Sequence, residues 1–214
     1  MKIINSIIKA ILFDMDGVLV DAREWHYAAL NNALEPFGCE IDLKEHLEEF
    51  DGLPTRVKLG MLTKKNRLPA YLHDLISEQK QRYTMELVWK NCHPLFSHEI
   101  LFRELKKSGI KTAVCSNSIG NTVKTIMKLV ALEDFLDLSL STDDVTEPKP
   151  SPEIYEMAMR KLNVEPLECL VIEDNPNGIQ AAIASGANVM KVSDPYGVSI
   201  DTINEFIKVN KLTK

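Results

Sequence analysis

The sequence predicts an α/β fold: a doubly wound, Rossmann-like parallel sheet with an inserted all-helical cap domain. Short runs that are apolar throughout alternate with helical stretches in the second half of the chain, which is typical of parallel strands buried on both faces. A long block with only helical signals separates the first apolar run from the second, and it is too long for one crossover connection. The 214 residues are sufficient for one such domain with an insertion.

The α/β domain is predicted to comprise residues 1–21 and 94–214. Its strand candidates are the apolar runs Lys9–Asp14, Ile110–Ser116, Leu138–Ser141, Cys169–Asp174 and Asn188–Val192. Helical patterns follow or precede each of them, at Ser97–Ser108, Ile119–Val130, Pro152–Leu162, Pro176–Ser185 and Asp201–Asn210. Gly109 and Gly186 stop two of these helices, so the elements alternate as a doubly wound sheet requires.

The helical block covers residues 22–93, which form the predicted cap domain. Asp21 can cap a first helix over 22–34, and Pro36 and Gly38 end it. Three further helices can begin at Asp42, at Pro54 or Thr55, and at Pro69. We expect the two linkers of this block to form a hinge.

Composition is that of an average soluble globular protein, with 45% hydrophobic and 26% charged residues. It excludes a disordered chain, a collagen-like fibre and a coiled coil. The net charge is −6 and no basic stripe is visible, which argues against a nucleic-acid partner. The four cysteines are far apart and form no Cys-x-x-Cys pair, so we expect neither a disulfide framework nor a zinc site.

The N-terminus is apolar, but Asn5, Ser6 and Lys9 interrupt it. A signal peptide needs a longer unbroken apolar stretch and a small-residue cleavage site. No run approaches the ~20 apolar residues that a membrane span requires. We therefore expect a cytoplasmic protein that does not contact a membrane. We also expect a monomer or a weak oligomer.

Polar residues end three of the strand candidates, at Asp14, at Ser116 and at Glu173-Asp174. In a doubly wound sheet ligands bind outside the carboxyl ends of the strands, so these clusters should converge on one crevice. Together with Asp16, this crevice would hold four carboxylates, which repel one another unless positive charge lies among them. Mg²⁺ with oxygen ligands suits such a site, especially if phosphate binds there too.

Asp14 and Asp16 are two residues apart, where a strand gives way to a loop. In extended chain both side chains point the same way, so one carboxylate can attack as a nucleophile while the other moves the proton. Gly17 permits the sharp turn that follows. A pair of solvated aspartates in an ordinary turn is the alternative.

Lys149 lies in the segment Glu147-Pro148-Lys149-Pro150, where the prolines hold their neighbours extended. Ser116 offers a hydroxyl and Asn117 a backbone N–H at a strand-to-helix transition, which is suited to phosphate oxygens. Each feature alone has an ordinary explanation, as a solvated lysine or as a polar turn.

Taken together, the run Asp14-Met15-Asp16-Gly17-Val18, then Ser116, Lys149-Pro150 and Glu173-Asp174 resemble the four motifs of the haloacid dehalogenase (HAD) superfamily in order and spacing. The intervals are 102 residues from Asp14 to Ser116, 33 to Lys149 and 25 to Asp174. The long first interval is what a helical cap inserted after the first strand produces in that family.

The resemblance implies roles for these positions. Asp14 would form an aspartyl-phosphate, and Asp16 would serve as general acid and base. Ser116, Asn117 and Lys149 would bind the phosphoryl group. The Mg²⁺ ligands would be Asp14, the backbone carbonyl of Asp16, Asp174 and Glu173.

Cap residues resemble the branch that contains β-phosphoglucomutase, pseudouridine-5′-phosphatase and several sugar-phosphate phosphatases. The matching stretches are Asp21–His26 and Asp51–Arg56, so His26 and Arg56 are candidate substrate contacts. A histidine packed on the helix surface and an exposed arginine are the alternatives. Ala22 stands where the mutase has a hydroxyl residue, and no lysine aligns securely with its cap lysine, Lys80 being the nearest.

The function predicted is a Mg²⁺-dependent phosphatase that hydrolyses a small phosphorylated metabolite, such as a sugar phosphate, through an aspartyl-phosphate. The first alternative is a β-phosphoglucomutase-like phosphomutase, which returns the phosphoryl group to a second hydroxyl. The second is a non-catalytic phospho-acceptor module.

Overall fold

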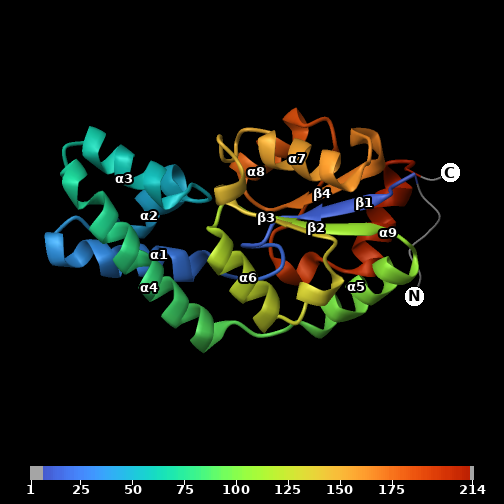
Figure 1. Ribbon diagram of the computed structural model, residues 1–214, viewed down its shortest axis with the longest axis horizontal. Coiled ribbons are helices and arrows are strands. Elements are labelled where there is room, and N and C mark those ends of the chain that lie inside the picture. Colours follow the sequence, from blue (N-terminus) through green and yellow to red (C-terminus); the bar gives the residue numbers. More distant parts are fainter. Residues whose placement is uncertain (1–6, 213–214) are drawn as a thin grey trace. The chain divides into compact units, whose positions relative to one another are not determined.

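Five parallel strands form one sheet in the order β3-β2-β1-β4-β5 (Figure 1). The computed structural model describes residues 7–212. The strands are β1 (Ala10–Phe13), β2 (Lys111–Cys115), β3 (Leu138–Leu140), β4 (Cys169–Glu173) and β5 (Asn188–Lys191). Strand β1 is central, with Leu12 paired to Ala113 of β2 and to Val171 of β4. Every residue of β1 is buried, as expected for an apolar strand in the middle of a covered sheet.

Helices α7 and α8 cover one face of the sheet, and α5, α6 and α9 cover the other (Figure 1). Their bounds are α5 (Phe96–Lys107), α6 (Gly120–Leu129), α7 (Glu153–Leu162), α8 (Pro176–Ala184) and α9 (Ile200–Val209). This arrangement confirms the predicted doubly wound α/β fold. Across residues 7–212, no helix combines the length and the apolar character that a bilayer-spanning segment needs.

The chain divides into two compact units, and the second of them is Ala22–Cys92. Its regular elements are helical: α1 (Arg23–Leu34), α2 (Leu43–Glu45), α3 (Thr55–Lys64), α4 (His73–Asn91), 3-10 turns at Glu35–Phe37 and Ala70–Leu72, and a π-helical turn at His46–Phe50. Helix α1 packs along α4. Leu34, Phe50, Leu59 and Ile76 are among the residues of a separate hydrophobic core in this unit.

Two helix starts in this unit test the capping predictions. The Asp42 side chain accepts a 2.8 Å hydrogen bond from the Glu45 backbone N–H, so it caps α2 as expected. The prediction that Asp21 caps the first helix is wrong. Helix α1 begins at Arg23, its N-cap residue is Ala22, and no side chain accepts a hydrogen bond there. Ala22 has φ −103° and ψ 1°, which is not the extended backbone that an N-cap side chain needs.

All four cysteines are buried, and none of them forms a disulfide within residues 7–212. Cys115 and Cys169 lie in the central strands β2 and β4. Burial raises the pKa of the Cys169 thiol to about 12, and it raises the pKa of Cys115 as well. Both side chains are therefore protonated, unreactive members of the core.

Candidate active site

The candidate site begins where the central strands end. Asp14 follows β1, and its backbone N–H donates to the carbonyl of Ile172 in β4. Ser116 follows β2, and its N–H donates to Leu140 of β3. Because the strands are parallel, these residues and Asp174 after β4 lie at the same edge of the sheet.

Lys149 is the buried cation of this edge. Its Nζ donates to Asp14 Oδ1 at 2.6 Å, to Glu173 Oε1 at 2.7 Å and to the Cys115 carbonyl at 2.7 Å. The lysine is 3% exposed. Burial alone lowers the pKa of the ammonium, but Asp14 and Glu173 outweigh it and hold that pKa above its ordinary value. Lys149 is therefore charged.

Asn117 holds the loop that carries this lysine. Its Oδ1 accepts from the Lys149 backbone N–H at 3.0 Å, and its Nδ2 donates to the Lys149 carbonyl at 3.2 Å. Next to it, the buried Ser116 Oγ accepts from the backbone N–H of Ser118 at 3.0 Å. The Asn117 side chain thus fixes the position of Lys149, a contact that the sequence did not suggest.

Three carboxylates lie close to one another beside the lysine. One oxygen from each of Asp14, Glu173 and Asp174 lies within 4.8 Å of the others. Burial raises the pKa of Asp14 well above its usual range, and the charges of Glu173, Asp16 and Asp174 act in the same direction. Lys149 opposes them. The cluster therefore carries more negative charge than one lysine balances.

Asp16 lies in the turn after β1, and its Oδ2 accepts from the Ser118 hydroxyl at 3.1 Å. Gly17 follows with φ +91°, and a Cβ built there would lie 2.0 Å from Asp174 Oδ2. Only glycine allows the turn to approach the Asp174 carboxylate so closely. Ser118 was missed as a site residue, although its place in the Ser-Asn-Ser run was a usable signal.

The residues of this cluster fit a divalent cation. Carboxylate oxygens are the ligands that hard cations such as Mg²⁺ and Ca²⁺ prefer, and three of them already lie within 4.8 Å of one another. The raised pKa of Asp14, whose first cause is burial, also reflects the surplus of negative charge that a cation would offset.

Tyr155 and Gly178 were also missed, and both contact Glu173. The Tyr155 hydroxyl donates to Glu173 Oε1 at 2.5 Å. A Cβ built on Gly178 of α8 would lie 1.8 Å from the same oxygen. Burial, followed by Glu173 and Asp14, raises the pKa of Tyr155 well above its usual range, so the hydroxyl stays protonated. A tyrosine on the otherwise apolar face of the helix after Lys149 was the available signal.

The two candidate substrate contacts, His26 and Arg56, lie in the helical unit. His26 Nδ1 is 3.3 Å from Lys80 Nζ, which joins α1 to α4. Arg56 is exposed in the first turn of α3. Both side chains therefore belong to one unit of the chain, and the four carboxylates and Lys149 belong to the other.

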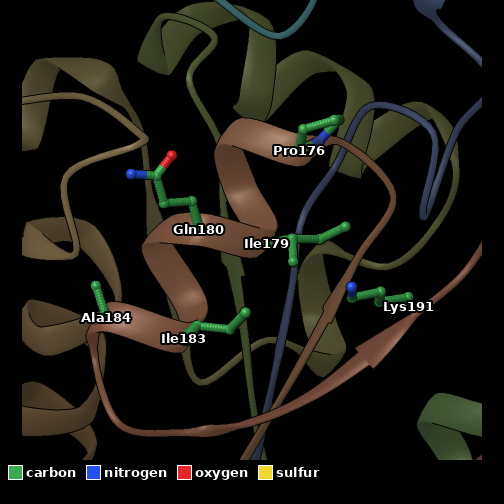
Figure 2. Close-up of a pocket in the computed structure, with 6 residues that line it drawn as sticks. All are labelled: Pro176, Ile179, Gln180, Ile183, Ala184 and Lys191. Atoms are coloured by element: carbon green, nitrogen blue, oxygen red, sulfur yellow. The ribbon is translucent and has the colours of Figure 1, made fainter.

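A cavity of about 450 Å³ lies beside α8 and β5 (Figure 2). Its lining consists of Pro176, Ile179, Gln180, Ile183, Ala184 and Lys191. Among these residues only Lys191 is charged, and none supplies a carboxylate. We therefore place the candidate active site at the carboxylate cluster and not in this cavity.

Residues 11–192 match the family described as haloacid dehalogenase-like hydrolase. The chain is 29% identical over 200 residues to the phosphorylated carbohydrates phosphatase of Thermotoga maritima, which covers 92% of this chain and 88% of that protein.

Two solved structures resemble this chain in fold and, more weakly, in sequence. The β-phosphoglucomutase of Clostridium difficile superposes with a TM-score of 0.80 at 25% identity, covering 94% of this chain and 99% of the other. CbbY from Rhodobacter sphaeroides, in complex with xylulose-(1,5)bisphosphate, gives 0.79 at 28% identity, covering 86% and 85%. The protein therefore belongs to the haloacid dehalogenase-like hydrolase family, in its branch of phosphatases and phosphomutases.

Proposed function

We propose that this protein is a Mg²⁺-dependent phosphatase that hydrolyses a small phosphorylated metabolite through an aspartyl-phosphate on Asp14. One observation carries the proposal. A buried lysine lies 2.6 Å from Asp14 inside a carboxylate cluster, at the carboxyl edge of the sheet where ligands of this fold class bind. Such a site offers a nucleophile together with preorganised positive charge for a transferring phosphoryl group.

In the first half-reaction an Asp14 carboxylate oxygen attacks phosphorus, and the bond from phosphorus to the ester oxygen breaks. Asp16, in its protonated form, gives its proton to the departing oxygen, so the product leaves as a neutral alcohol. Lys149 compensates the charge on the transferring group from its position beside Asp14. Ser116 and the backbone N–H of Asn117 bind the other phosphoryl oxygens.

In the second half-reaction Asp16 takes a proton from a water molecule, whose oxygen attacks the phosphorus of the aspartyl-phosphate. The bond from phosphorus to Asp14 breaks, and inorganic phosphate and the free carboxylate result. Mg²⁺ would be held by Asp14, Asp174, Glu173 and the Asp16 carbonyl, and when bound it supplies positive charge that offsets the carboxylates and the phosphate.

The helical unit acts in this proposal as a cap that closes over the substrate and excludes bulk water. His26 and Arg56 contact the part of the substrate that is not transferred, because a guanidinium and an imidazole suit hydroxyl and anionic groups. Similarity to a phosphatase of phosphorylated carbohydrates supports a sugar phosphate as the substrate class.

The test is a phosphate-release screen with Mg²⁺ over sugar phosphates, nucleotides and p-nitrophenyl phosphate. We expect Asp14→Asn to lower turnover by at least a thousandfold, because an amide does not attack phosphorus, while the protein remains folded by circular dichroism. Asp201→Asn, at an exposed position in α9, makes the same change of charge and should leave turnover unchanged. Substantial activity in the Asp14 variant would contradict the nucleophile assignment.

A phosphomutase is the second candidate. The similarity to a β-phosphoglucomutase favours it. Incubation with β-glucose 1-phosphate followed by chromatography separates the two functions. Inorganic phosphate as the product supports the phosphatase, and an isomerised sugar phosphate supports the mutase.

A further inference from the structure

A tyrosine hydroxyl is buried next to the reacting groups without touching Asp14 directly. Tyr155 is fully buried on α7, and its hydroxyl donates to Glu173 Oε1 at 2.5 Å. Its ring also lies against the lysine, with Nζ 4.8 Å from the ring centroid. The ring belongs to the hydrophobic core, but packing does not require the hydroxyl, since a phenylalanine would fill the same volume without a buried polar group.

Three hydrogen bonds hold the Glu173 carboxylate. Its Oε1 accepts from Lys149 and Tyr155, and its Oε2 accepts from the Asp174 backbone N–H at 3.2 Å. Gly178 makes room for the carboxylate beside α8, because a methyl group at that position would lie 1.8 Å from Oε1. These hydrogen bonds define the position of the carboxylate, and the tyrosine hydroxyl donates one of them.

The same Oε1 atom is shared between the tyrosine and the lysine. Lys149 Nζ divides its donors between Glu173 at 2.7 Å and Asp14 at 2.6 Å. Of the two side chains that donate to Oε1, Lys149 alone would remain if the Tyr155 hydroxyl were removed. A Glu173 oxygen with one fewer hydrogen-bond donor would then draw the ammonium toward itself and away from Asp14.

We infer that Tyr155 is a positioning residue for the phosphoryl-transfer step: its hydroxyl holds Glu173 so that Lys149 remains directed at Asp14. The inference rests on the proposed function and deepens it. It predicts an effect on the chemical step and not on substrate binding, because Tyr155 acts on the charge beside the attacking oxygen. Simple core packing would instead be satisfied by any aromatic ring of this size.

The test is Tyr155→Phe, which keeps the ring and removes only the hydroxyl. We expect kcat for p-nitrophenyl phosphate, and for the best substrate of the screen, to fall about tenfold with KM within twofold of the wild type. A tenfold loss corresponds to about 1.4 kcal/mol in the activation free energy. Tyr27→Phe is the matched control, since the Tyr27 hydroxyl also donates one hydrogen bond, to the Ile41 carbonyl, and it should leave kcat unchanged.

A double-mutant cycle with Glu173→Gln separates positioning from packing. If the tyrosine acts through Glu173, adding Tyr155→Phe to Glu173→Gln changes kcat by less than twofold. The inference is overturned if Tyr155→Phe keeps kcat within twofold of the wild type, or if it costs the same factor in both backgrounds. Thermal unfolding of each variant confirms that the proteins compared are folded.

The proposed function and the role of Tyr155 are contradicted by different results. If the wild type releases no phosphate and isomerises no sugar phosphate with Mg²⁺ present, the proposed function is wrong. If the wild type is active and Tyr155→Phe matches it, only the role of Tyr155 is wrong.

Discussion

At the scale of single residues, the site depends on how one lysine is shared. Lys149 is buried together with Asp14 and Glu173, and the contacts of 2.6 and 2.7 Å connect all three. Taking such groups out of water is costly, and a well-packed apolar set is often as stable. We therefore interpret these ion pairs as preorganised charge for a reaction and not as a source of stability.

Lys149→Met is expected to lose both stability and activity. Methionine leaves two buried carboxylates without their cation, which should lower the free energy of unfolding by about 3 kcal/mol. Phosphate release should fall at least a hundredfold, because a preorganised charge at the phosphoryl group is lost. Denaturant unfolding and a phosphate assay measure the two effects.

Two further variants make that result interpretable. Lys107→Met breaks a surface ion pair with Glu104 and should cost less than about 1 kcal/mol. Adding Glu173→Gln to Lys149→Met should recover part of the lost stability, because one uncompensated charge is removed. Equal stability of the wild type and Lys149→Met would contradict the ion-pair argument.

His46 makes the stability of the protein depend on pH. It is 2% exposed, its ring lies against Tyr27, and its Nε2 is 3.7 Å from Asp51 Oδ1. Burial first, then the charges of Lys58 and His26, lower its pKa to about 4, although Asp51 acts in the opposite direction. The folded protein therefore holds His46 neutral under conditions in which the unfolded chain protonates it.

The unfolded chain binds the extra proton below about pH 6.5, so stability is full above that pH and falls as the pH decreases toward 4. The difference amounts to roughly 3 kcal/mol over this window. We expect His46→Gln to lose less stability than the wild type between pH 7 and pH 4 in denaturant unfolding. His93→Gln, at an exposed position, should follow the wild type. Parallel curves for all three proteins would refute this role of His46.

At the scale of elements, helix α8 completes the site. Asn175 caps it by accepting from the Asn177 N–H at 2.9 Å, and Pro176 begins it. The first turn of α8 then brings Gly178 against Glu173. Strand β4 and helix α8 thus hold the Glu173 carboxylate between them. The carboxylate fits there because Gly178 has no side chain.

Gly178→Ala is expected to damage the protein in spite of the better helix propensity of alanine. The added methyl group would meet Glu173 Oε1 at 1.8 Å, so the carboxylate or the helix must move. We expect a loss of about 2 kcal/mol in the free energy of unfolding and at least a tenfold loss of kcat. Gly60→Ala in α3 is the control, because nothing lies within 4 Å of its Cβ position. It should stabilise the protein by about 0.5–1 kcal/mol.

At the scale of the whole molecule, the two units contribute different chemistry. The α/β unit holds the carboxylates and the lysine on the edge of a rigid parallel sheet, where strand order decides which loops meet. The helical unit has a core of its own and presents His26 and Arg56 from α1 and α3. In the proposed function the first unit carries out the reaction and the second selects the substrate.

Removal of divalent cations tests the charge balance of the α/β unit. EDTA should abolish phosphate release, and added Mg²⁺ should restore it, because the carboxylate cluster carries excess negative charge. Mg²⁺ should also raise the Tm of the wild type, since it binds the native cluster. Asp174→Asn should weaken this rise in Tm, whereas Asp201→Asn should not. Full activity in EDTA would show that the cluster needs no cation.

Much of the fold follows from local sequence pattern. The apolar runs identified β1, β2 and β4, and even the weaker run at residues 188–192 contains β5. The start of helix α1 was misplaced by one residue, because capping depends on the φ and ψ of Ala22 and not on residue type alone. The sequence pattern was sufficient to select the loop at Lys149. It could not predict that the Asn117 side chain binds this loop, since 32 positions separate the two residues.

The sheet, its helical layers and the acidic and basic residues at the strand ends could be predicted from the sequence, because apolar periodicity and residue type are local properties. How Lys149, Glu173 and Asp16 are paired depends instead on contacts between residues far apart in the chain. Tyr155 meets Glu173, Gly178 makes room for it and Ser118 meets Asp16 across distances of 5 to 102 positions in the chain. Such contacts depend on how α7, α8 and the loop after β2 pack around the sheet, and packing is a property of the whole chain.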